Sequence, residues 1–573
     1  MATLRELLLL LLLTVVSLVF PLCCTLSSCR AALDRRAVHT CHTCDVLARH
    51  DLTANQHARA QFMKGKQPLF LTFGSGSMRD FILNWHAQTQ KALPGQATLM
   101  AALDEGAESV CEEHGFACVS FSKDTRMHTG GTYWRQNEDT FLRMATLKTT
   151  FLAAILTAGY DVWMSDLDVV WLSSPWPWSG GSTEAVVPEA QWLAHADVIA
   201  STDIIRIEDE KQYPGWLIQR ECNTGVIFFR ATEQAILLAL QWRLRVYEER
   251  HVSYKNDQAS FNRMFDGGSV SALAPALEPG DRVRGVFRRH GPNLGNATPV
   301  FGTVPMDVFL NGHTFFAQKM HKEHGKKPVV VHATYVFSDE PRYSFGKRHR
   351  LREMQAWHVD PDEYYAGRFV NLAEATLLDD VAATFDAVPQ WNATADNRGT
   401  PTGIETHVSW MDVQRARLAK LFVLAHREKT VLILPHFVSF CERHFWLLEK
   451  CRVAGNSMSL PRVLPLDHAL EIGRMYDAGL EFREADLTKN VRFKGSTVVT
   501  MTLSEVDETC LEPGEHGYFE KVVEAMYISV SFCGKEDWYI PEGGVWDPKQ
   551  QPLNCTRGFG RPVVNECAKR EYL

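Results

Sequence analysis

Asp166 and Asp168 are the residues of this chain whose type and spacing are best suited to chemistry. They follow the apolar run Gly159-Tyr-Asp-Val-Trp-Met-Ser165, which predicts a strand, and alternate residues of a strand point to the same face. Two carboxylates on one face can bind one hard divalent cation. Mn²⁺ or Mg²⁺ bound in this way leaves positions for water and phosphate oxygens. The pattern therefore predicts Mn²⁺ or Mg²⁺ as the cofactor and a nucleoside diphosphate as the ligand.

The same spacing recurs at Asp360-Pro361-Asp362, which provides an internal comparison. Proline and polar neighbours predict a solvent-exposed turn there, and we expect the substitution Asp360→Ala to be nearly neutral. Asp166 and Asp168 instead lie in a strongly apolar stretch, where two unpaired carboxylates would be costly to bury. A bound cation would offset that cost, so the first pair is favoured as the metal site.

Further polar residues stand at the ends of expected strands and helices. His332 closes the run Val329-Val-Val331 and is a candidate third metal ligand, with a hydrogen-bonded core histidine as the alternative. Asp257 and Gln258 precede a helix and are suited to holding sugar hydroxyls, although Asp257 is equally suited to capping that helix. Asn223 precedes a glycine at the start of a strand, where backbone can approach a ligand closely, and a plain turn explains it as well.

Positive charge near these positions offers candidates for phosphate binding. Lys347 and Arg348 belong to the cluster Gly346-Lys-Arg-His-Arg350, which follows His332 and suits a pyrophosphate leaving group. A solvated helix face is the alternative for this cluster. Lys148, on the helix that leads into the Asp166 strand, is a further phosphate candidate, although lysines on helix surfaces are common.

Length and composition fit a large translocated protein. The chain has 573 residues, 45% of them apolar, which allows two to four domains, and its net charge of -8 gives no pattern of nucleic-acid binding. Residues 7–24 are almost entirely apolar, so we expect residues 1–24 to be a signal anchor or a cleaved signal peptide, and favour the anchor. We expect the membrane to be contacted through this segment. Fourteen cysteines and the sequons at Asn296, Asn392 and Asn554 fit a lumenal body.

The elements that must position the candidate residues alternate between strands and helices. Such alternation predicts an α/β sheet with its ligand at the carboxyl edge of the strands. A polar stem is expected over 25–65, this first domain over 66–365, a turn-rich linker over 366–400 and a smaller α/β domain over 401–573. The expected strands are 68–73, the apolar run from 159 that ends in Asp166 and Asp168, 196–200, 224–229, 328–331 and 430–435, and the expected helices are 78–93, 139–158, 232–249 and 413–427.

Several of these motifs, taken in order, resemble one known family. They are Gly159-Tyr-Asp-Val-Trp-Met-Ser-Asp-Leu-Asp-Val-Val-Trp-Leu-Ser-Ser-Pro175, Asn223-Thr-Gly-Val, Asn256-Asp-Gln, Val331-His-Ala-Thr-Tyr and Gly346-Lys-Arg-His-Arg-Leu-Arg-Glu353. Over about residues 66–365 the chain is similar to the plant and algal nucleotide-diphospho-sugar transferases of glycosyltransferase family 77. The most similar branch is that of the arabinosyltransferases acting on hydroxyproline-rich glycoproteins, which also carry a second domain resembling Val413 to Pro435 and Leu464-Pro-Leu-Asp-His468.

The resemblance implies a GT-A-type Rossmann-like fold, Mn²⁺ dependence, residence as a single-pass type II protein of the Golgi membrane, and transfer with retention of configuration. The implied reaction moves a sugar, expected to be L-arabinofuranose, from a UDP-sugar to a cell-wall glycoprotein or glycan. Asp166 and Asp168 would bind the donor and the metal, His332 would complete the metal ligands, and Asp257 would orient the sugar. Lys347 and Arg348 would assist the departure of UDP.

Some alternatives remain open at this level. Ser173 and Ser174 follow the metal-site strand where family members commonly have a basic residue, so a xylosyl- or galactosyltransferase of the same family is an alternative. A haloacid-dehalogenase-like phosphatase also carries two aspartates at a strand end, with Asp166 then acting as nucleophile and Asp168 as acid. An inactive glycan-binding relative is the third class.

Overall fold

The computed structural model describes most of the chain from residue 69 to residue 526. The described residues are 69–120, 138–180, 187–212, 221–249, 256–273, 286–338, 343–378, 401–439, 442–444, 447–450 and 462–526. The expected anchor, the stem and the sequons at Asn392 and Asn554 lie outside them. Among the described residues, no helix has the length and apolar character needed to cross a membrane. The chain divides into two compact units, Met1–Asn311 with His321–His332, and Gly312–Met320 with Ala333–Leu573.

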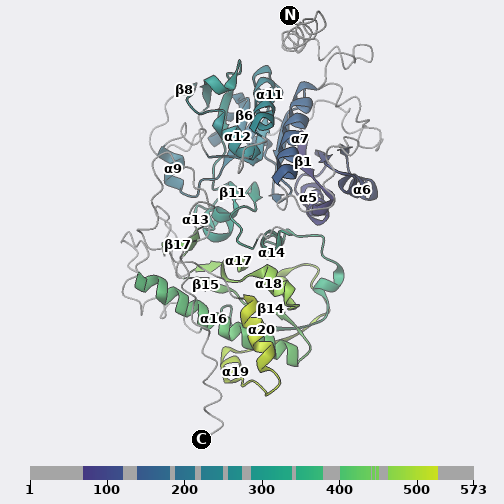
Figure 1. Cartoon of the computed structure of the whole chain (residues 1–573), viewed down its shortest axis with the longest axis vertical. Coiled ribbons are helices and arrows are strands. Elements are labelled where there is room, and N and C mark those ends of the chain that lie inside the picture. Colours follow the sequence, from purple (N-terminus) through teal and green to yellow (C-terminus); the bar gives the residue numbers. More distant parts are fainter. Residues whose placement is uncertain are drawn as a thin grey trace, which may run out of the picture. The chain divides into compact units, whose positions relative to one another are not determined.

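A nine-stranded mixed sheet forms the centre of the first unit (Figure 1). Strands β1, β2, β3 and β4 run parallel, β7 runs antiparallel to both β4 and β6, and β10 is parallel to β6. The strand order is β3-β2-β1-β4-β7-β6-β10-β9-β8. The strands are β1 (Leu69–Gly74), β2 (Ala97–Ala102), β3 (Cys118–Ser120), β4 (Val162–Ser165), β6 (Val198–Thr202), β7 (Cys222–Phe229), β8 (Ser269–Ala272), β9 (Phe287–His290) and β10 (Val300–Thr303).

The helices α5 (Arg79–Ala92) and α6 (Glu105–His114) connect the first three strands. The sequence predicts β1 and α5 from their hydrophobic patterns, and both are confirmed, whereas the periodicity of β2 is ambiguous. Helix α6 begins where the Asp104 carboxylate accepts from the Ala107 amide at 2.9 Å, and it ends at Gly115 with φ of 67°, a conformation that suits glycine. A disulfide between Cys111 and Cys118 joins α6 to β3.

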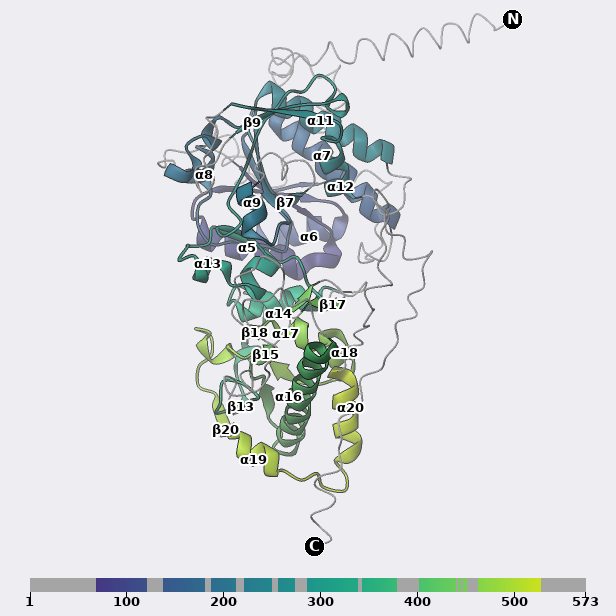
Figure 2. The same ribbon diagram turned by 90° about the vertical axis from the view of Figure 1, so that its left-hand side faces the viewer.

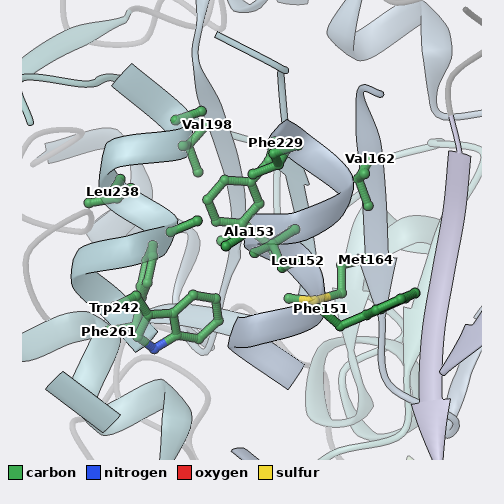
Figure 3. Close-up of a cluster of buried hydrophobic side chains, with 14 of the residues drawn as sticks. Phe151, Leu152, Ala153, Val162, Met164, Val198, Phe229, Leu238, Trp242 and Phe261 are labelled. Atoms are coloured by element: carbon green, nitrogen blue, oxygen red, sulfur yellow. The ribbon is translucent and has the colours of Figure 1, made fainter. Parts of the chain in front are cut away.

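One face of the large sheet is covered by α7 (Glu138–Thr157), α11 (Glu233–Glu248) and α12 (Asp257–Arg263). The expected helices 139–158 and 232–249 are thereby confirmed, and α7 and α11 lie side by side. Phe151 and Leu152 from α7, Trp242 from α11 and Phe229 of β7 belong to one cluster of buried hydrophobic side chains (Figure 3). The packing of α7 in this core places Lys148 within hydrogen-bonding distance of Asp166, the residue that follows β4.

A second, three-stranded sheet supports the site. It consists of β5 (Val169–Trp171), β11 (Phe309–Asn311) and β12 (Val330–His332). Strand β12 is parallel to β11 and antiparallel to β5, with His332 paired to Val169. Because Val169 directly follows Asp168, this register places His332 next to the two aspartates. Short helices α8 (Trp176–Ser179) and α9 (Ile207–Gln212) also belong to this unit.

The second unit contains a parallel sheet in the order β19-β14-β13-β20. Helix α16 (Pro401–Arg427) connects β13 to β14 and packs beside α20 (His516–Met526) (Figure 2). The strands are β13 (Arg368–Leu372), β14 (Val431–Ile433), β19 (Phe482–Arg483) and β20 (Thr497–Met501). Smaller elements are α14 (Phe345–Glu353), α17 (Leu466–Ala469), α18 (Ile472–Asp477), α19 (Leu503–Glu508) and the paired strands β15 (Phe437–Ser439) with β18 (Arg462–Leu464) and β16 (Glu442–His444) with β17 (Leu447–Lys450).

The division between the units differs from the sequence-based boundary. We expect a linker over 366–400, yet β13 lies within it and is a central strand of the second sheet. Helix α14, expected to belong to the first domain, is also part of the second unit. Local sequence shows neither fact, because β13 is only a five-residue strand whose partners begin about sixty or more residues later.

The interpretation of Asp360 as part of a solvent-exposed turn is wrong. Asp360 is 8% exposed, and its carboxylate accepts from Arg352 Nε at 2.8 Å and Nη2 at 2.5 Å and from the Trp357 indole at 3.1 Å. Asp362, two residues later, is exposed and contacts Arg492. A buried arginine on α14 therefore turns one aspartate of this pair inward, and the expectation that Asp360→Ala is nearly neutral is withdrawn.

Candidate active site

Asp166, Asp168 and His332 form a compact group of metal-ligand type. One ligand atom from each lies within 4.8 Å of the others. The Nε2 atom of His332 is 3.3 Å from Oδ1 of Asp168 and 3.8 Å from Oδ2 of Asp166. Two carboxylates and one imidazole suit Mn²⁺ or Mg²⁺, with room in the coordination shell for water and phosphate oxygens. The side chain of Asp166 is 33% exposed, so the group is open to a ligand.

The tautomer of His332 also suits a ligand role. Its Nδ1 atom lies 3.1 Å from the side-chain oxygen of Asn223, and that oxygen already accepts from the Gly225 amide at 2.8 Å. Because the oxygen only accepts, Nδ1 carries the proton and donates, and the lone pair of Nε2 faces the two aspartates. A hydrogen bond of this kind orients a metal-binding histidine and fixes its tautomer. Asn223 therefore acts on His332.

Gly225 is required by the close packing of this group. An added Cβ would lie 2.2 Å from Cε1 of His332 and 2.8 Å from Oδ2 of Asp166. The Gly225 carbonyl accepts from the Asp166 amide at 2.9 Å, so a backbone hydrogen bond joins β7 to Asp166. The glycine proposed from sequence as a close-approach position is thus in contact with two of the three metal-ligand candidates.

Lys148 is buried beneath the site. Its ammonium donates to Asp166 Oδ1 at 3.2 Å, to Asp257 Oδ2 at 2.7 Å and to the Thr224 carbonyl at 3.2 Å. Its side chain is 3% exposed, and its three N–H groups all have protein acceptors. These contacts give Lys148 a positioning role between two carboxylates, in place of the phosphate contact suggested by the sequence.

Asp257 and Gln258 are brought to the site by the start of α12. Asn256 caps this helix, since its side chain accepts from the Ala259 amide at 2.7 Å. Asp257 does not cap the helix. Its Oδ2 accepts from Lys148 and from the Thr224 hydroxyl at 3.1 Å. The amide of Gln258 accepts from the Thr224 backbone N–H at 3.2 Å. The alternative reading of Asp257 as the helix cap is excluded.

Asp203 is a site residue that sequence reasoning missed. It accepts from Asn223 at 2.6 Å and from Gln258 at 2.7 Å, so it links the histidine-orienting amide to the start of α12. Its position just after β6 was the available signal, because a carboxylate at a strand end is the feature that identified Asp166. No second carboxylate accompanies it in the sequence, and its partners are twenty or more residues away.

Electrostatics couple these charged groups. Loss of hydration raises the pKa of Asp166 above its ordinary value, while Lys148 and His332 oppose the shift. Burial alone would lower the pKa of Lys148, but Asp166 and Asp257 outweigh it and the pKa is raised. Lys148 is therefore charged at neutral pH. Burial also raises the pKa of Asp203, against the effect of its hydrogen bond from Asn223. The site concentrates carboxylates that a cation would stabilise.

Lys347 and Arg348 lie on α14, which belongs to the second compact unit. Both side chains are partly exposed, and the Arg348 guanidinium lies 4.1 Å from the ring centre of Tyr343. The structure thus brings together seven residues from the first unit. They are Lys148, Asp166, Asp168, Asn223, Asp257, Gln258 and His332, all of them expected from the sequence.

Comparison with known proteins also identifies this part of the chain as similar to nucleotide-sugar transferases. Residues 96–351 match the model of a family described as nucleotide-diphospho-sugar transferase. This segment contains every site residue named above.

Residues 96–351 form a nucleotide-diphospho-sugar transferase domain.

The transferase domain and part of the chain outside it have relatives in Arabidopsis thaliana. Arabinosyltransferase XEG113 is 28% identical over 413 residues, which cover 71% of this chain and 56% of that protein. UDP-D-xylose:L-fucose alpha-1,3-D-xylosyltransferase 3 is 24% identical over 222 residues, which cover 38% of this chain and 48% of that protein. The chain therefore spans about half the length of these relatives. The resemblance to nucleotide-diphospho-sugar transferases expected from the motifs is confirmed.

Part of the chain is also similar to solved glycosyltransferase structures. The galactosyltransferase LgtC in complex with donor and acceptor sugar analogues is 14% identical, and the match covers 52% of this chain and 98% of that one with a TM-score of 0.29. The glycosyltransferase GlyE of Streptococcus pneumoniae is 9% identical, covering 57% and 73% with a TM-score of 0.29. The expected GT-A-type α/β fold of the transferase domain is confirmed by its family and by its mixed sheet with an Asp-x-Asp pair after β4.

Proposed function

We propose that this protein is a divalent-metal-dependent, retaining glycosyltransferase that moves L-arabinofuranose from a UDP-sugar to a cell-wall glycoprotein or glycan. The observation that carries the proposal is the group of Asp166, Asp168 and His332 within a nucleotide-diphospho-sugar transferase domain. A nucleoside diphosphate needs a hard cation to offset its charge, and these three side chains are suited to hold one.

The choice of sugar is supported by the extent of the sequence match. The arabinosyltransferase is matched over 413 residues, which is more than the whole transferase domain at residues 96–351. The xylosyltransferase is matched over 222 residues. Similarity to the arabinosyltransferase thus includes part of the chain beyond the transferase domain. Xylosyl transfer is the second candidate, favoured by that shorter match.

The proposed chemistry assigns a task to each residue. Asp166, Asp168 and His332 would hold Mn²⁺, or Mg²⁺, which when bound supplies Lewis-acid stabilisation of the leaving diphosphate. Lys148 keeps the carboxylates of Asp166 and Asp257 in fixed positions.

Asp257 and Gln258, at the start of α12, are proposed to orient the donor sugar, and Asp257 would stabilise positive charge that develops at its anomeric carbon. Lys347 and Arg348 are proposed to stabilise the negative charge of departing UDP as fixed cations.

The proposed setting is the Golgi membrane, with residues 7–24 as a type II anchor and the catalytic region in the lumen. The apolar run supports a membrane-associated segment, and the Golgi setting rests on the resemblance to family 77 glycosyltransferases. A phosphatase of the haloacid-dehalogenase type is not favoured, because β7 runs antiparallel next to β4 and the histidine beside the aspartates would have no role in it.

A donor screen tests the proposal. The purified lumenal region with Mn²⁺ and a short arabinosylated hydroxyproline acceptor should transfer from UDP-β-L-arabinofuranose in preference to UDP-xylose or UDP-galactose. A pocket that hydrogen-bonds one sugar can reject an analogue that lacks the matching hydroxyl by roughly 10⁴-fold. Transfer only from UDP-xylose or UDP-galactose would refute the arabinosyl assignment. Absence of metal-dependent UDP-sugar turnover with every donor, including hydrolysis, would refute the enzymatic one.

A further inference from the structure

Arg350, on α14, is a fully buried cation with acceptors on several segments of the second unit. Its Nε donates to Asp467 Oδ1 at 2.9 Å, and its Nη2 donates to Asp467 Oδ2 at 3.0 Å. Arg350 and Asp467 are 0% and 1% exposed. This two-point ion pair fixes the plane of the guanidinium, because both carboxylate oxygens are engaged. The remaining N–H groups of Arg350 are then directed at backbone carbonyls.

Those carbonyls belong to the two segments that continue from β11 and β12. Nη1 of Arg350 donates to the Gly312 carbonyl at 3.4 Å and to the Thr334 carbonyl at 3.2 Å. Gly312 follows the last residue of β11, and Thr334 is two residues after His332. The Gly312 amide also donates to the Thr334 hydroxyl at 3.2 Å. A Cβ at residue 312 would lie 1.9 Å from the Thr334 carbonyl oxygen, so the two segments are in close contact.

The same guanidinium holds a strained residue. Tyr335 has φ of 55°, which is costly for a residue other than glycine, and its carbonyl accepts from Arg350 Nη2 at 2.7 Å. Asp467 reinforces this arrangement directly, since its Oδ2 accepts from the Phe337 amide at 2.9 Å. The backbone that follows His332 is therefore held at Thr334, Tyr335 and Phe337 by one buried ion pair.

We propose that Asp467 is a positioning residue of the metal site. It holds Arg350, and Arg350 fixes the segment that continues from His332, so that the imidazole keeps its place beside the aspartates. The inference rests on the proposed metal role of His332. Asp467 lies well beyond the family-matched segment at residues 96–351, so the transferase domain depends on a residue from the later part of the chain. An excised fragment ending near residue 365 would leave Arg350 buried without its carboxylate.

The chain offers a matched control on the same helix. Arg352 is 5% exposed and forms a two-point ion pair with Asp360, as Arg350 does with Asp467. Its Nη1 donates to the Tyr476 hydroxyl at 3.2 Å, and within the described part of the chain its side chain makes no hydrogen bond to residues 332–337. Asp467→Asn and Asp360→Asn therefore each replace the buried carboxylate partner of an arginine on α14, and they differ in whether the segment after His332 is involved.

The test compares Mn²⁺ binding and backbone hydrogen exchange in the purified lumenal region. Free Mn²⁺ is measured by its electron paramagnetic resonance signal, and exchange is followed in peptides covering residues 332–337. Both variants should melt earlier than the wild type. Asp467→Asn should also weaken Mn²⁺ binding on the order of tenfold, as loss of an outer partner of a metal ligand does, and should speed exchange after His332. Asp360→Asn should do neither.

A double variant, Arg350→Met with Asp467→Leu, covers the case in which Asp467→Asn does not fold. An apolar pair of similar volume commonly replaces a buried ion pair without loss of stability, but it cannot bind the three carbonyls. We expect it to fold and to bind Mn²⁺ weakly. Unchanged Mn²⁺ affinity and unchanged exchange, in Asp467→Asn or in the double variant, would overturn the inference. Wild-type protein that binds no Mn²⁺ would instead overturn the proposed metal dependence, and the positioning role with it.

Discussion

Substitution of Gly225 by alanine is the sharpest test of the site geometry. The added methyl would lie 2.2 Å from Cε1 of His332, and ordinary van der Waals contact begins near 3.4 Å. The imidazole must therefore move by more than 1 Å, or β7 must shift by a similar amount. The second nearest atom is Oδ2 of Asp166 at 2.8 Å, so both neighbours of the methyl are metal-ligand candidates.

The size of the expected effect follows from the tolerance of metal sites. Metal–ligand distances in proteins hold to within about 0.2 Å, so a shift above 1 Å removes a ligand from the shell. We expect Mn²⁺ binding to weaken on the order of 100-fold, which is the upper end of the effect of altering an outer partner of a metal ligand. The cost in stability should be limited to about 1–3 kcal/mol of overpacking, since Gly225 lies in a strand with no requirement for positive φ.

Mn²⁺ titration and thermal denaturation of Gly225→Ala measure the two quantities separately. Gly302→Ala, in β10, is the control. Its added Cβ would lie equally close, at 2.2 Å, to the flexible end of Leu193, which is not a residue of the metal site. The control should lose a little stability and keep its metal affinity. If Gly225→Ala binds Mn²⁺ as tightly as the wild type, the proposed arrangement of His332 and Asp166 around one cation is wrong.

Four further predictions concern single side chains. Asp168→Ala should abolish transfer and weaken Mn²⁺-dependent UDP binding while the circular dichroism spectrum is unchanged; full activity in the folded variant would exclude a metal role. His332→Ala should raise the Mn²⁺ concentration for half-maximal activity more than it lowers the Tm, whereas a lower Tm alone would indicate a packing role. Lys148→Met leaves the Asp166 and Asp257 carboxylates without their cation, so it should cost about 3–5 kcal/mol in urea unfolding without metal, and added Mn²⁺ should recover part of that loss. Burial raises the pKa of Glu353 from 4.5 to about 8, so the folded state binds more protons than the unfolded state between these values and stability falls as pH rises through them; Glu353→Gln, which retains an acceptor for the Leu466 amide, should flatten this dependence in unfolding measured from pH 5 to pH 8.

Much of the site could be predicted from the sequence because its signals are local. The aspartates at 166 and 168 stand after a recognisable buried strand, and His332 closes another one. The helix before Asp166 is identified by its apolar spacing. These features depend on only a few neighbouring residues, so tertiary context did not change them. Asp166 and Asp168 themselves lie in the turn between β4 and β5, so strand alternation does not set the direction of their side chains.

The role of each residue beyond the metal ligands was decided by partners distant in the chain. Lys148 has the sequence setting of a surface lysine, yet Asp257, 109 residues later, makes it a buried link between two carboxylates. Asp203 has no motif at all and acquires its role from Asn223 and Gln258. Hydrogen-bond partners at such separations are set by strand order and helix packing, which local propensity does not encode.

The two Asp-x-Asp pairs show the same limit. Their spacing is identical, and apolar surroundings correctly marked the first as the pair that faces another ligand-type side chain. The second pair was expected to be exposed, but Arg352 of α14 pairs with Asp360, and these two side chains are buried together. The sequence by itself determined the strand before the aspartates, the two closely spaced carboxylates and the histidine that ends β12. Only the tertiary structure decided which charges are paired and buried. The free-energy cost of removing a charge from water is offset by a charged partner, and the position of that partner depends on the whole fold.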